Sequence, residues 1–114
     1  MNQGEVWIVS LPFSSEREQS GERPAIVLQD ALYGHRSPLV LIALLTSQQS
    51  ALRFPATVLI QPSSGNGLTL PSVAMVFQAR ALDRTRFKRK IGDVEAGDLT
   101  AILDELQMLV GRTP

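Results

Sequence analysis

The sequence predicts a mainly β protein, a small barrel of about five to seven short strands with one C-terminal α-helix over about residues 95–110. Two observations lead to this class. The first three quarters of the chain consist of short apolar or β-branched runs separated by turn residues. The last segment changes to the apolar spacing of a helix. A chain of 114 residues fits one domain spanning residues 1–114.

The first half of the chain supplies three predicted strands. Residues 5–11 are rich in β-branched and aromatic side chains, which is typical of a strand. Residues 12–22 are polar and contain proline and glycine, so we expect a loop. The next two strands, residues 24–29 and 38–45, are almost wholly apolar. In a small barrel such strands are covered by the interior on one face and by a helix or a partner subunit on the other.

The second half adds shorter strands and a turn. We expect strands at residues 55–61 and 72–79, and a short one near residues 85–91. Between the first two lies a turn-rich stretch whose Asn66-Gly67 pair tolerates positive φ.

The C-terminal segment has a helical pattern of apolar residues. They recur at i, i+3, i+4 and i+7, and Gly111 supplies a natural stop. Because one face is apolar, we expect the helix to lie against the barrel. The side chains of this face, which we expect in the core together with Trp7, are Leu99, Ile102, Leu103, Leu106, Leu109 and Val110.

Composition excludes several classes of site. The chain has no cysteine, which excludes disulfides, zinc–thiolate centres and thiol catalysis. The carboxylates show no metal-ligand spacing and the glycines form no P-loop or dinucleotide fingerprint, so we expect no metal and no cofactor. No signal peptide and no apolar run of about 18 residues is present, so we expect a cytoplasmic protein that does not enter a membrane.

Charge must act locally if it acts at all. Eleven basic and eleven acidic residues give a formal net charge of zero. An anion site would therefore depend on how these charges are arranged. The single histidine, His35, lies in a predicted loop and is expected to face solvent rather than to act as a base.

The densest group of polar residues lies at the end of the first loop, over residues 17–24. Pro24 biases Arg23 towards an extended conformation, so Arg23 stands where a loop becomes a rigid strand. This is a good place for a positioned cation. The alternative is a solvated hairpin loop whose charges pair with one another.

Two further segments suit phosphate. Thr46 and Ser47 directly follow the apolar strand 38–45, and hydroxyls at a strand end donate to phosphate or orient a nucleophile. The alternative is a polar strand exit with local turns. In residues 84–90, five of the seven side chains are basic, which favours phosphate contacts with Phe87 stacking on a base. The alternative is an edge strand protected by lysines and arginines.

Taken in order, these segments resemble the MazF/PemK (Kid-like) family of type II toxin-antitoxin toxins. The match runs from Gly4 to the end of the helix. Each motif is weak by itself, and their order and spacing make the resemblance specific. The matching segments are the first strand GEVWIVSL (4–11), the loop EQSGERP (18–24), the strand exit LTS (45–47) and the late segment SVAMVFQARALD (72–83).

The resemblance implies an SH3-like barrel, a homodimer and metal-independent, sequence-specific cleavage of single-stranded RNA. In this chemistry a ribose 2′-hydroxyl attacks the adjacent phosphate and leaves a 2′,3′-cyclic phosphate and a 5′-hydroxyl. It also implies a cognate antitoxin that blocks the RNA groove and forms a DNA-binding complex with the toxin.

The resemblance also assigns roles to residues. Arg23 would stabilise charge on the phosphate, since an arginine keeps its proton and is a poor general acid. Glu18 would be the base, and Thr46 would hydrogen-bond a phosphate oxygen. Further RNA contacts are expected from Arg17, Ser47, Gln78, Arg80, Arg86 and Lys88.

The sequence departs from the family pattern at several positions. Arg17 stands where some members carry a histidine, and Met75 and Phe77 stand where some carry an arginine and an aspartate. Glu22 adds a carboxylate that would partly offset the charge of Arg23. The Kid-like acid–base set therefore does not transfer whole.

Two other functions remain open for such a barrel, because a fold does not fix a function. One is a CcdB-like gyrase poison, and the other is an RNA-binding module without cleavage. A homodimer is expected in addition because strand 38–45 is wholly apolar and the chain is small.

Overall fold

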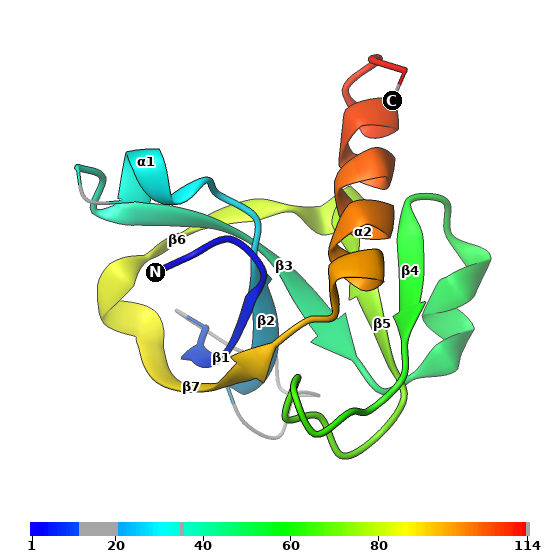
Figure 1. Ribbon diagram of the computed structural model, residues 1–114, viewed down its shortest axis with the longest axis horizontal. Coiled ribbons are helices and arrows are strands. Elements are labelled where there is room, and N and C mark those ends of the chain that lie inside the picture. Colours follow the sequence, from blue (N-terminus) through cyan, green and yellow to red (C-terminus); the bar gives the residue numbers. More distant parts are fainter. Residues whose placement is uncertain (12–20, 35, 114) are drawn as a thin grey trace.

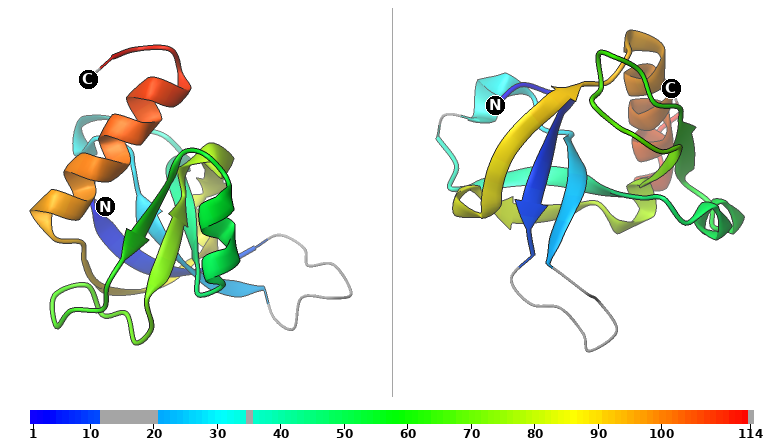
Figure 2. Two further views of the ribbon diagram at one scale, coloured as in Figure 1. Left: turned by 90° about the vertical axis from the view of Figure 1, so that its right-hand side faces the viewer. Right: turned by 90° about the horizontal axis from the view of Figure 1, so that it is seen from below.

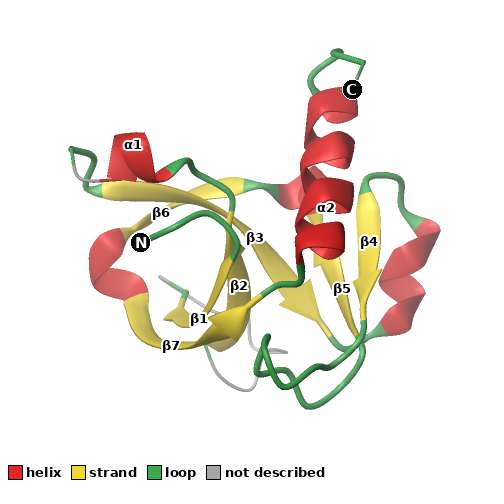
Figure 3. Ribbon diagram, viewed as in Figure 1, coloured by secondary structure: helices red, strands yellow, loops and turns green. Residues whose placement is uncertain are grey.

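Seven antiparallel strands form the body of the computed structural model, which describes residues 1–11, 21–34 and 36–113 (Figure 1). The strands are β1 Glu5–Ser10, β2 Glu22–Val27, β3 Leu39–Thr46, β4 Thr57–Ile60, β5 Ser72–Met75, β6 Arg80–Asp83 and β7 Phe87–Asp93. The helices are α1 Ala31–Gly34 and α2 Ala96–Leu109, with 3-10 turns η1 Gln49–Arg53, η2 Val76–Gln78 and η3 Arg84–Arg86 (Figure 3).

The long strand β3 is the centre of the sheet. Strand order is β4-β5-β3-β2-β1-β7, and β6 also pairs with β3. The two strands β6 and β5 share one edge of β3: Ile42 opposes Arg80, and Leu45 opposes Ala74. On the other edge β2 runs alongside, with Ile26 opposite Ala43. Because β3 is shared in this way, the sheet curls into a barrel (Figure 2).

Alternation along the strands produces two cores on opposite faces of the sheet. The first core lies under α2, whose Ile102 is fully buried. The second core fills the barrel and is lined at its rim by Trp7 and Phe87. Its buried members are Val9, Ala25, Val27, Val40, Ile42, Leu44 and Leu82. Within the described residues no ladder joins β6 to β7, and η3 crosses this gap in the barrel.

The predicted architecture is confirmed, and its late part is corrected. The strand predicted at 72–79 ends at Met75, and Val76–Gln78 form a 3-10 turn instead. The chain has to turn there because β5 pairs with the end of β3, whereas β6 pairs with its beginning. The predicted late strand near 85–91 is β7, and it lies at the end of the sheet order as an edge strand.

Two burial predictions are wrong. Leu109 and Val110 are 48% and 67% exposed, because the end of α2 extends beyond β4 (Figure 1). Trp7 is only partly buried, at the rim of the second core.

Most of strand 38–45 is covered by the single chain. Its side chains from Val40 to Leu45 are buried or half-buried, alternately in the two cores, whereas Leu39 is 43% exposed. The apolar character of this strand is therefore mostly explained without a second copy. In the part of the chain that the structure describes, no helix has the length and apolar character needed to cross a membrane.

The turn between β4 and β5 is organised by a buried asparagine. Asn66 is fully buried and uses its whole side-chain amide. Its Nδ2 donates to the Gln61 carbonyl at 2.9 Å, while its Oδ1 accepts from the backbone N–H groups of Ser63 at 3.0 Å and Leu68 at 2.9 Å. Gly67 follows at φ +72°, and a Cβ there would lie 2.1 Å from the Ile91 carbonyl oxygen.

We predict that Asn66→Ala lowers the free energy of unfolding by about 2–4 kcal/mol, because it leaves two backbone donors and one acceptor of a tight turn unpaired. Urea denaturation measures this loss. Ser64→Ala, at an exposed position of the same turn, is the control and should unfold like the wild type. Equal stability of the two variants would contradict the role of Asn66.

A polar cluster of Glu5, Trp7, Lys90 and Asp93 joins β1 to β7. The Glu5 side chain is only 9% exposed; its Oε1 accepts the Trp7 indole N–H at 2.8 Å, and its Oε2 lies 3.5 Å from Lys90 Nζ. Lys90 also lies 3.2 Å from Asp93. Burial alone would raise the pKa of Glu5. The hydrogen bond from Trp7, a hydrogen bond with the Asn2 backbone and the positive charge of Lys90 together hold this pKa below its ordinary value.

A lowered pKa in the folded state makes the ionised Glu5 stabilising. We predict that this contribution is present above the ordinary pKa of 4.5 and is lost as pH falls through the lower folded-state pKa. Glu5→Gln should therefore flatten the loss of stability on acidification, as measured by urea unfolding at a series of pH values from neutral to acid. Trp7→Phe removes the indole donor and should flatten it in part. If the stability of Glu5→Gln fell with pH in parallel with that of the wild type, the stabilising role of ionised Glu5 would be refuted.

Candidate active site

Arg23 and Thr46 lie at the same end of two neighbouring strands. In the β2–β3 ladder Ala25 opposes Leu44 and Val27 opposes Ile42. The paired residues of this ladder end at Ala25 and Leu44, and Arg23 and Thr46 lie two residues further on, at the same ends of β2 and β3. By strand alternation both side chains lie on the face of Ala25 and Leu44. The fold thus brings together a cation and a hydroxyl that are far apart in the sequence.

The same cross-strand row extends over most of the sheet. Arg23 opposes Val9 on β1, Val9 opposes Phe87 on β7, and Thr46 opposes Val73 on β5. Because Val9 is buried in the second core, Arg23 stands at the mouth of that core.

The floor around Arg23 is apolar. Leu11 and Met75 are partly buried and pack against the second core from the strands that flank the pair. Met75 lies one position further along the β3–β5 ladder, beside Leu44. Apolar surroundings keep water away from one side of a cation, which strengthens its interaction with an anion on the other side. These apolar neighbours of Arg23 could not be predicted from the sequence, except that Met75 stands where some family members carry an arginine.

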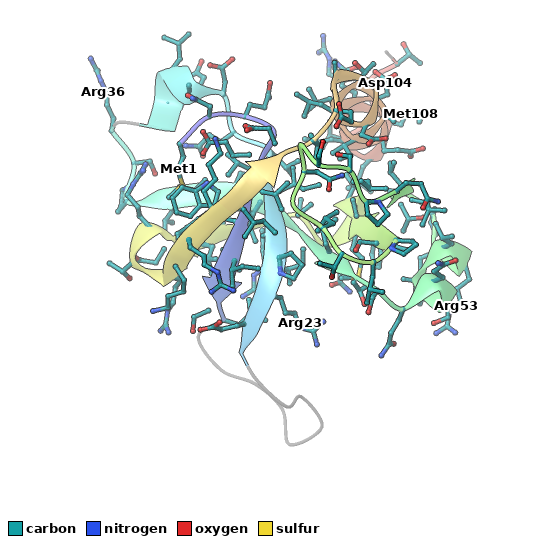
Figure 4. The ribbon with its side chains drawn as sticks, turned by 60° about the horizontal axis from the view of Figure 1, so that its bottom comes forward. Met1, Arg23, Arg36, Arg53, Asp104 and Met108 are labelled. Carbon is teal, nitrogen blue, oxygen red and sulfur yellow. The ribbon has the colours of Figure 1, made fainter. Side chains whose placement is uncertain are left out.

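The Arg23 side chain is held at a fixed backbone position. Its residue is paired with Val9 and is followed by Pro24, which fixes the extended conformation that we predicted. Figure 4 shows Arg23 at the end of β2. Arg23 is partly exposed, so its guanidinium is accessible to a ligand.

Thr46 presents an oriented hydroxyl. Its Oγ1 accepts the backbone N–H of Gln48 at 3.2 Å, a local turn that begins at the strand end. A hydroxyl that accepts this bond keeps its own hydrogen for donation. Ser47 follows directly and is exposed. Arg23 and Thr46 therefore offer hydrogen-bond donors of two kinds, a charged guanidinium and a neutral hydroxyl.

Glu22 is directed away from this pair. Successive residues of a strand point to opposite faces, so Glu22 and Arg23 lie on different faces of β2. The Glu22 carboxylate is 4.0 Å from the Arg89 guanidinium across the sheet. The expected offset of the Arg23 charge by Glu22 is weakened by this arrangement.

The other predicted RNA contacts lie at different distances from the pair. Arg86 and Lys88 flank Phe87, which shares the row of Arg23. Lys88 is exposed and is passed over in the β1–β7 register, so it occupies a β-bulge. Arg80 opposes Ile42, about 13 Å along β3 from Thr46 at the usual rise of a strand, and Gln78 lies two residues before it.

Three of the predicted residues cannot be placed. Arg17, Glu18 and His35 lie outside the described residues. The connection that contains Glu18 leaves β1 at Leu11 and returns at Gly21, whose carbonyl accepts the Leu11 N–H at 2.8 Å. In the described ranges no group of three or more His, Asp or Glu side chains is placed to hold a metal ion.

A cation and a hydroxyl at neighbouring strand ends of a small open barrel define a barrel protein with a candidate anion site. The family model of the PemK-like, MazF-like toxin of type II toxin-antitoxin system matches residues 2–110, and the chain belongs to this family.

Individual relatives agree with the family match. The endoribonuclease MazF of Staphylococcus saprophyticus is 32% identical over 91 residues, which cover 80% of this chain and 75% of the relative. A crystal structure of MazF from Deinococcus radiodurans superposes with a TM-score of 0.76 at 27% identity, covering 97% of this chain and 96% of that one. A MazE–MazF crystal structure from the same organism gives a TM-score of 0.78 at 26% identity, with the same coverage of 97% and 96%.

Proposed function

We propose that this chain is a toxin endoribonuclease that cleaves single-stranded RNA without a metal ion, with residues 1–114 acting as one domain in the cytoplasm, where its substrate is found. Membership of the toxin family and similarity to a relative named as an endoribonuclease support the activity. The single observation that supports it most is the position of Arg23 and Thr46, each two residues beyond the last β2–β3 pair, Ala25 and Leu44, and on the same face. A gyrase poison would not need this pair.

The pair suits the chemistry of an internal phosphate transfer. The ribose 2′-hydroxyl loses its proton to a base and attacks the adjacent phosphorus, and the bond to the 5′-oxygen breaks. The products are a 2′,3′-cyclic phosphate and a 5′-hydroxyl, the latter taking up a proton. Arg23 stabilises the charge that develops on the phosphoryl oxygens, and Thr46 donates a hydrogen bond to one of them.

The base is assigned to Glu18. It stands five residues before Arg23 in the sequence, in the connection between β1 and β2. A carboxylate is a side-chain base that can accept the proton in such a step.

The RNA strand is proposed to follow the basic side chains along the barrel mouth. Lys88 and Arg86 on one flank supply phosphate contacts, as phosphate-binding proteins commonly do with lysine and arginine. The remaining contacts are assigned to Arg17, Ser47, Gln78 and Arg80.

We predict that the purified protein cleaves single-stranded RNA in EDTA and that Arg23→Ala lowers kcat/KM by about 10²–10³-fold, the usual cost of removing one transition-state donor. Thr46→Val should give a smaller loss because a neutral hydrogen bond is weaker than a charged one. Gel analysis of a labelled RNA, with chemical identification of the cyclic phosphate end, measures both effects.

Arg112→Ala, an exposed arginine beyond α2, is the matched control and should cleave like the wild type. RNA binding without cleavage would support the non-catalytic barrel. Gyrase-linked DNA damage without RNA cleavage would support the gyrase poison. Either result would contradict the proposed endoribonuclease.

The proposed homodimer needs an apolar surface other than β3. Exposed apolar side chains gather at the end of α2, where Met108, Leu109 and Val110 are 50%, 48% and 67% exposed. Together with Pro55, Ala56 and the charged Glu105, Met108 and Leu109 line a hollow of about 320 Å³. We assign the contact with a second copy to this helix-end patch, because burial of such residues is the usual driving force of association.

We predict that Leu109→Asp shifts the protein from dimer to monomer in analytical ultracentrifugation at micromolar concentration. Leu70→Asp is the control, since Leu70 is 57% exposed but lies in the loop before β5. A wild-type protein that sediments as a monomer, or a Leu109→Asp variant that remains dimeric, would refute this surface.

The antitoxin partner follows from the family. A toxin of a type II system is paired with an antitoxin, and a MazF relative has been crystallised with MazE. We propose that a cognate antitoxin blocks the barrel mouth of this chain and forms with it a complex that binds DNA.

A further inference from the structure

Three side chains outside the Arg23–Thr46 pair form a continuous stack. The guanidinium carbon of Arg53 lies 4.7 Å from the centroid of the Phe54 ring. The rings of Phe54 and Phe77 are 5.2 Å apart between centroids and inclined by 38°. The order is guanidinium, ring, ring, which is the arrangement expected of a cation over an aromatic face.

The backbone holds both rings in place. The Phe54 N–H donates to the Ala51 carbonyl at 3.1 Å and so ends η1. The Phe77 N–H donates to the Ala56 carbonyl, also at 3.1 Å, which ties η2 to the segment after η1. The stack is therefore built on two fixed turns.

The outer end of the stack is open. Phe54 is 41% exposed and Arg53 is exposed. Among the described residues, no carboxylate lies within salt-bridge distance of Arg53, so the stack carries an accessible positive charge. A guanidinium that lies on a ring and faces solvent offers a flat, charged surface.

The stack lies on the same side of the sheet as the Arg23–Thr46 pair. The turn η1 packs against β4 and β5, and Figure 2 shows it on the side of these strands opposite α2. The turn η1 begins three residues after Thr46, and it packs against β5, whose Val73 opposes Thr46. Figure 4 shows Arg23 beside β2 and Arg53 on η1, both on the lower part of the molecule.

We propose that Arg53, supported by Phe54 and Phe77, is the subsite for an unpaired nucleobase next to the cleaved bond. The base stacks on the outer plane of the guanidinium, which is a usual way of holding a splayed base of single-stranded RNA. Small barrels that bind single strands contact about 4–16 nucleotides, so η1, which begins three residues after Thr46, falls within one site. This inference rests on the proposed endoribonuclease function and specifies how it selects its substrate.

The chemistry of Phe77 supports a base rather than a second protein copy at this place. The Phe77 ring extends the stack on the other side of Phe54 and adds no charge to it, so the charge of Arg53 stays available. A charged, planar surface next to a phosphate-binding pair fits a nucleotide, which has both a flat base and an anionic backbone.

The experiment compares wild type, Arg53→Lys and Arg53→Ala on RNA oligonucleotides that contain the mapped cleavage site. In each oligonucleotide one nucleotide near that site keeps its ribose and phosphate but lacks its base. Arg53→Lys keeps the charge and removes the plane. Arg36→Lys and Arg36→Ala are the matched controls, on the other side of the molecule in Figure 4.

We expect one abasic position to lower kcat/KM of the wild type by about 5- to 100-fold, the range for the loss of one stacked base. Both Arg53 variants should show a loss of similar size on intact RNA and no further loss at that abasic position, because the base and the guanidinium plane act as a pair. The Arg36 variants should keep the full abasic penalty. An Arg53→Lys enzyme with the wild-type rate and the wild-type abasic profile would overturn the subsite.

Failure of the subsite is distinguishable from failure of the proposed function. If wild type cleaves no RNA, the function fails, and fluorescence anisotropy with the intact and abasic oligonucleotides still tests the subsite by binding. Equal binding by wild type and Arg53→Lys would then overturn it. Arg53 variants that change only the sedimentation of the protein would show that the stack contacts a second copy, which also overturns it. Circular dichroism melting confirms that the variants are folded.

Discussion

The structure depends on burial of one strand on both faces. Because β3 is apolar from Leu39 to Leu45, each face must be covered, and the chain does this with α2 on one side and with the barrel interior on the other. A strand of eight residues is long enough to pair with β6 near its start and with β5 near its end. This double pairing curls the sheet and leaves the polar end of β3, Thr46, at the mouth of the second core.

The site depends on local arrangement because the chain has no excess charge. Equal numbers of acidic and basic residues mean that no long-range field draws RNA to the barrel. The strand pleat separates the charges instead: Arg23 points to the face of the second core, whereas Glu22 on the opposite face approaches Arg89. A neutral protein thereby presents a cationic site over an apolar floor.

Local patterns in the sequence predicted the strands and the helix. They could not predict the register in which the strands pair. The apolar runs around Ile42 and the spacing around Ile102 indicate a strand and a helix because burial is periodic. The turn at Val76–Gln78 leaves no such pattern, since it arises from the change of pairing partner along β3. Thr46 and Arg23 each occupy a predicted strand end, and only the β2–β3 ladder, which ends at Leu44 and Ala25, shows that these two strand ends are neighbours. The exposure of Leu109 depends on how far α2 extends past β4, which no local pattern encodes.

The departures from the family pattern replace charged side chains with an apolar one and an aromatic one. Where some members carry an arginine and an aspartate, this chain has Met75, which packs on the second core, and Phe77, which stacks on Phe54. Losing a charged pair removes both an attraction and a repulsion for phosphate, so the net electrostatic change is small. The gain is apolar surface on the second core and aromatic surface beside Phe54, and stacking on such surface falls off less with salt than phosphate contacts do. Binding in this groove is thus expected to rest more on unstacked bases than on the backbone, which favours single strands over duplexes.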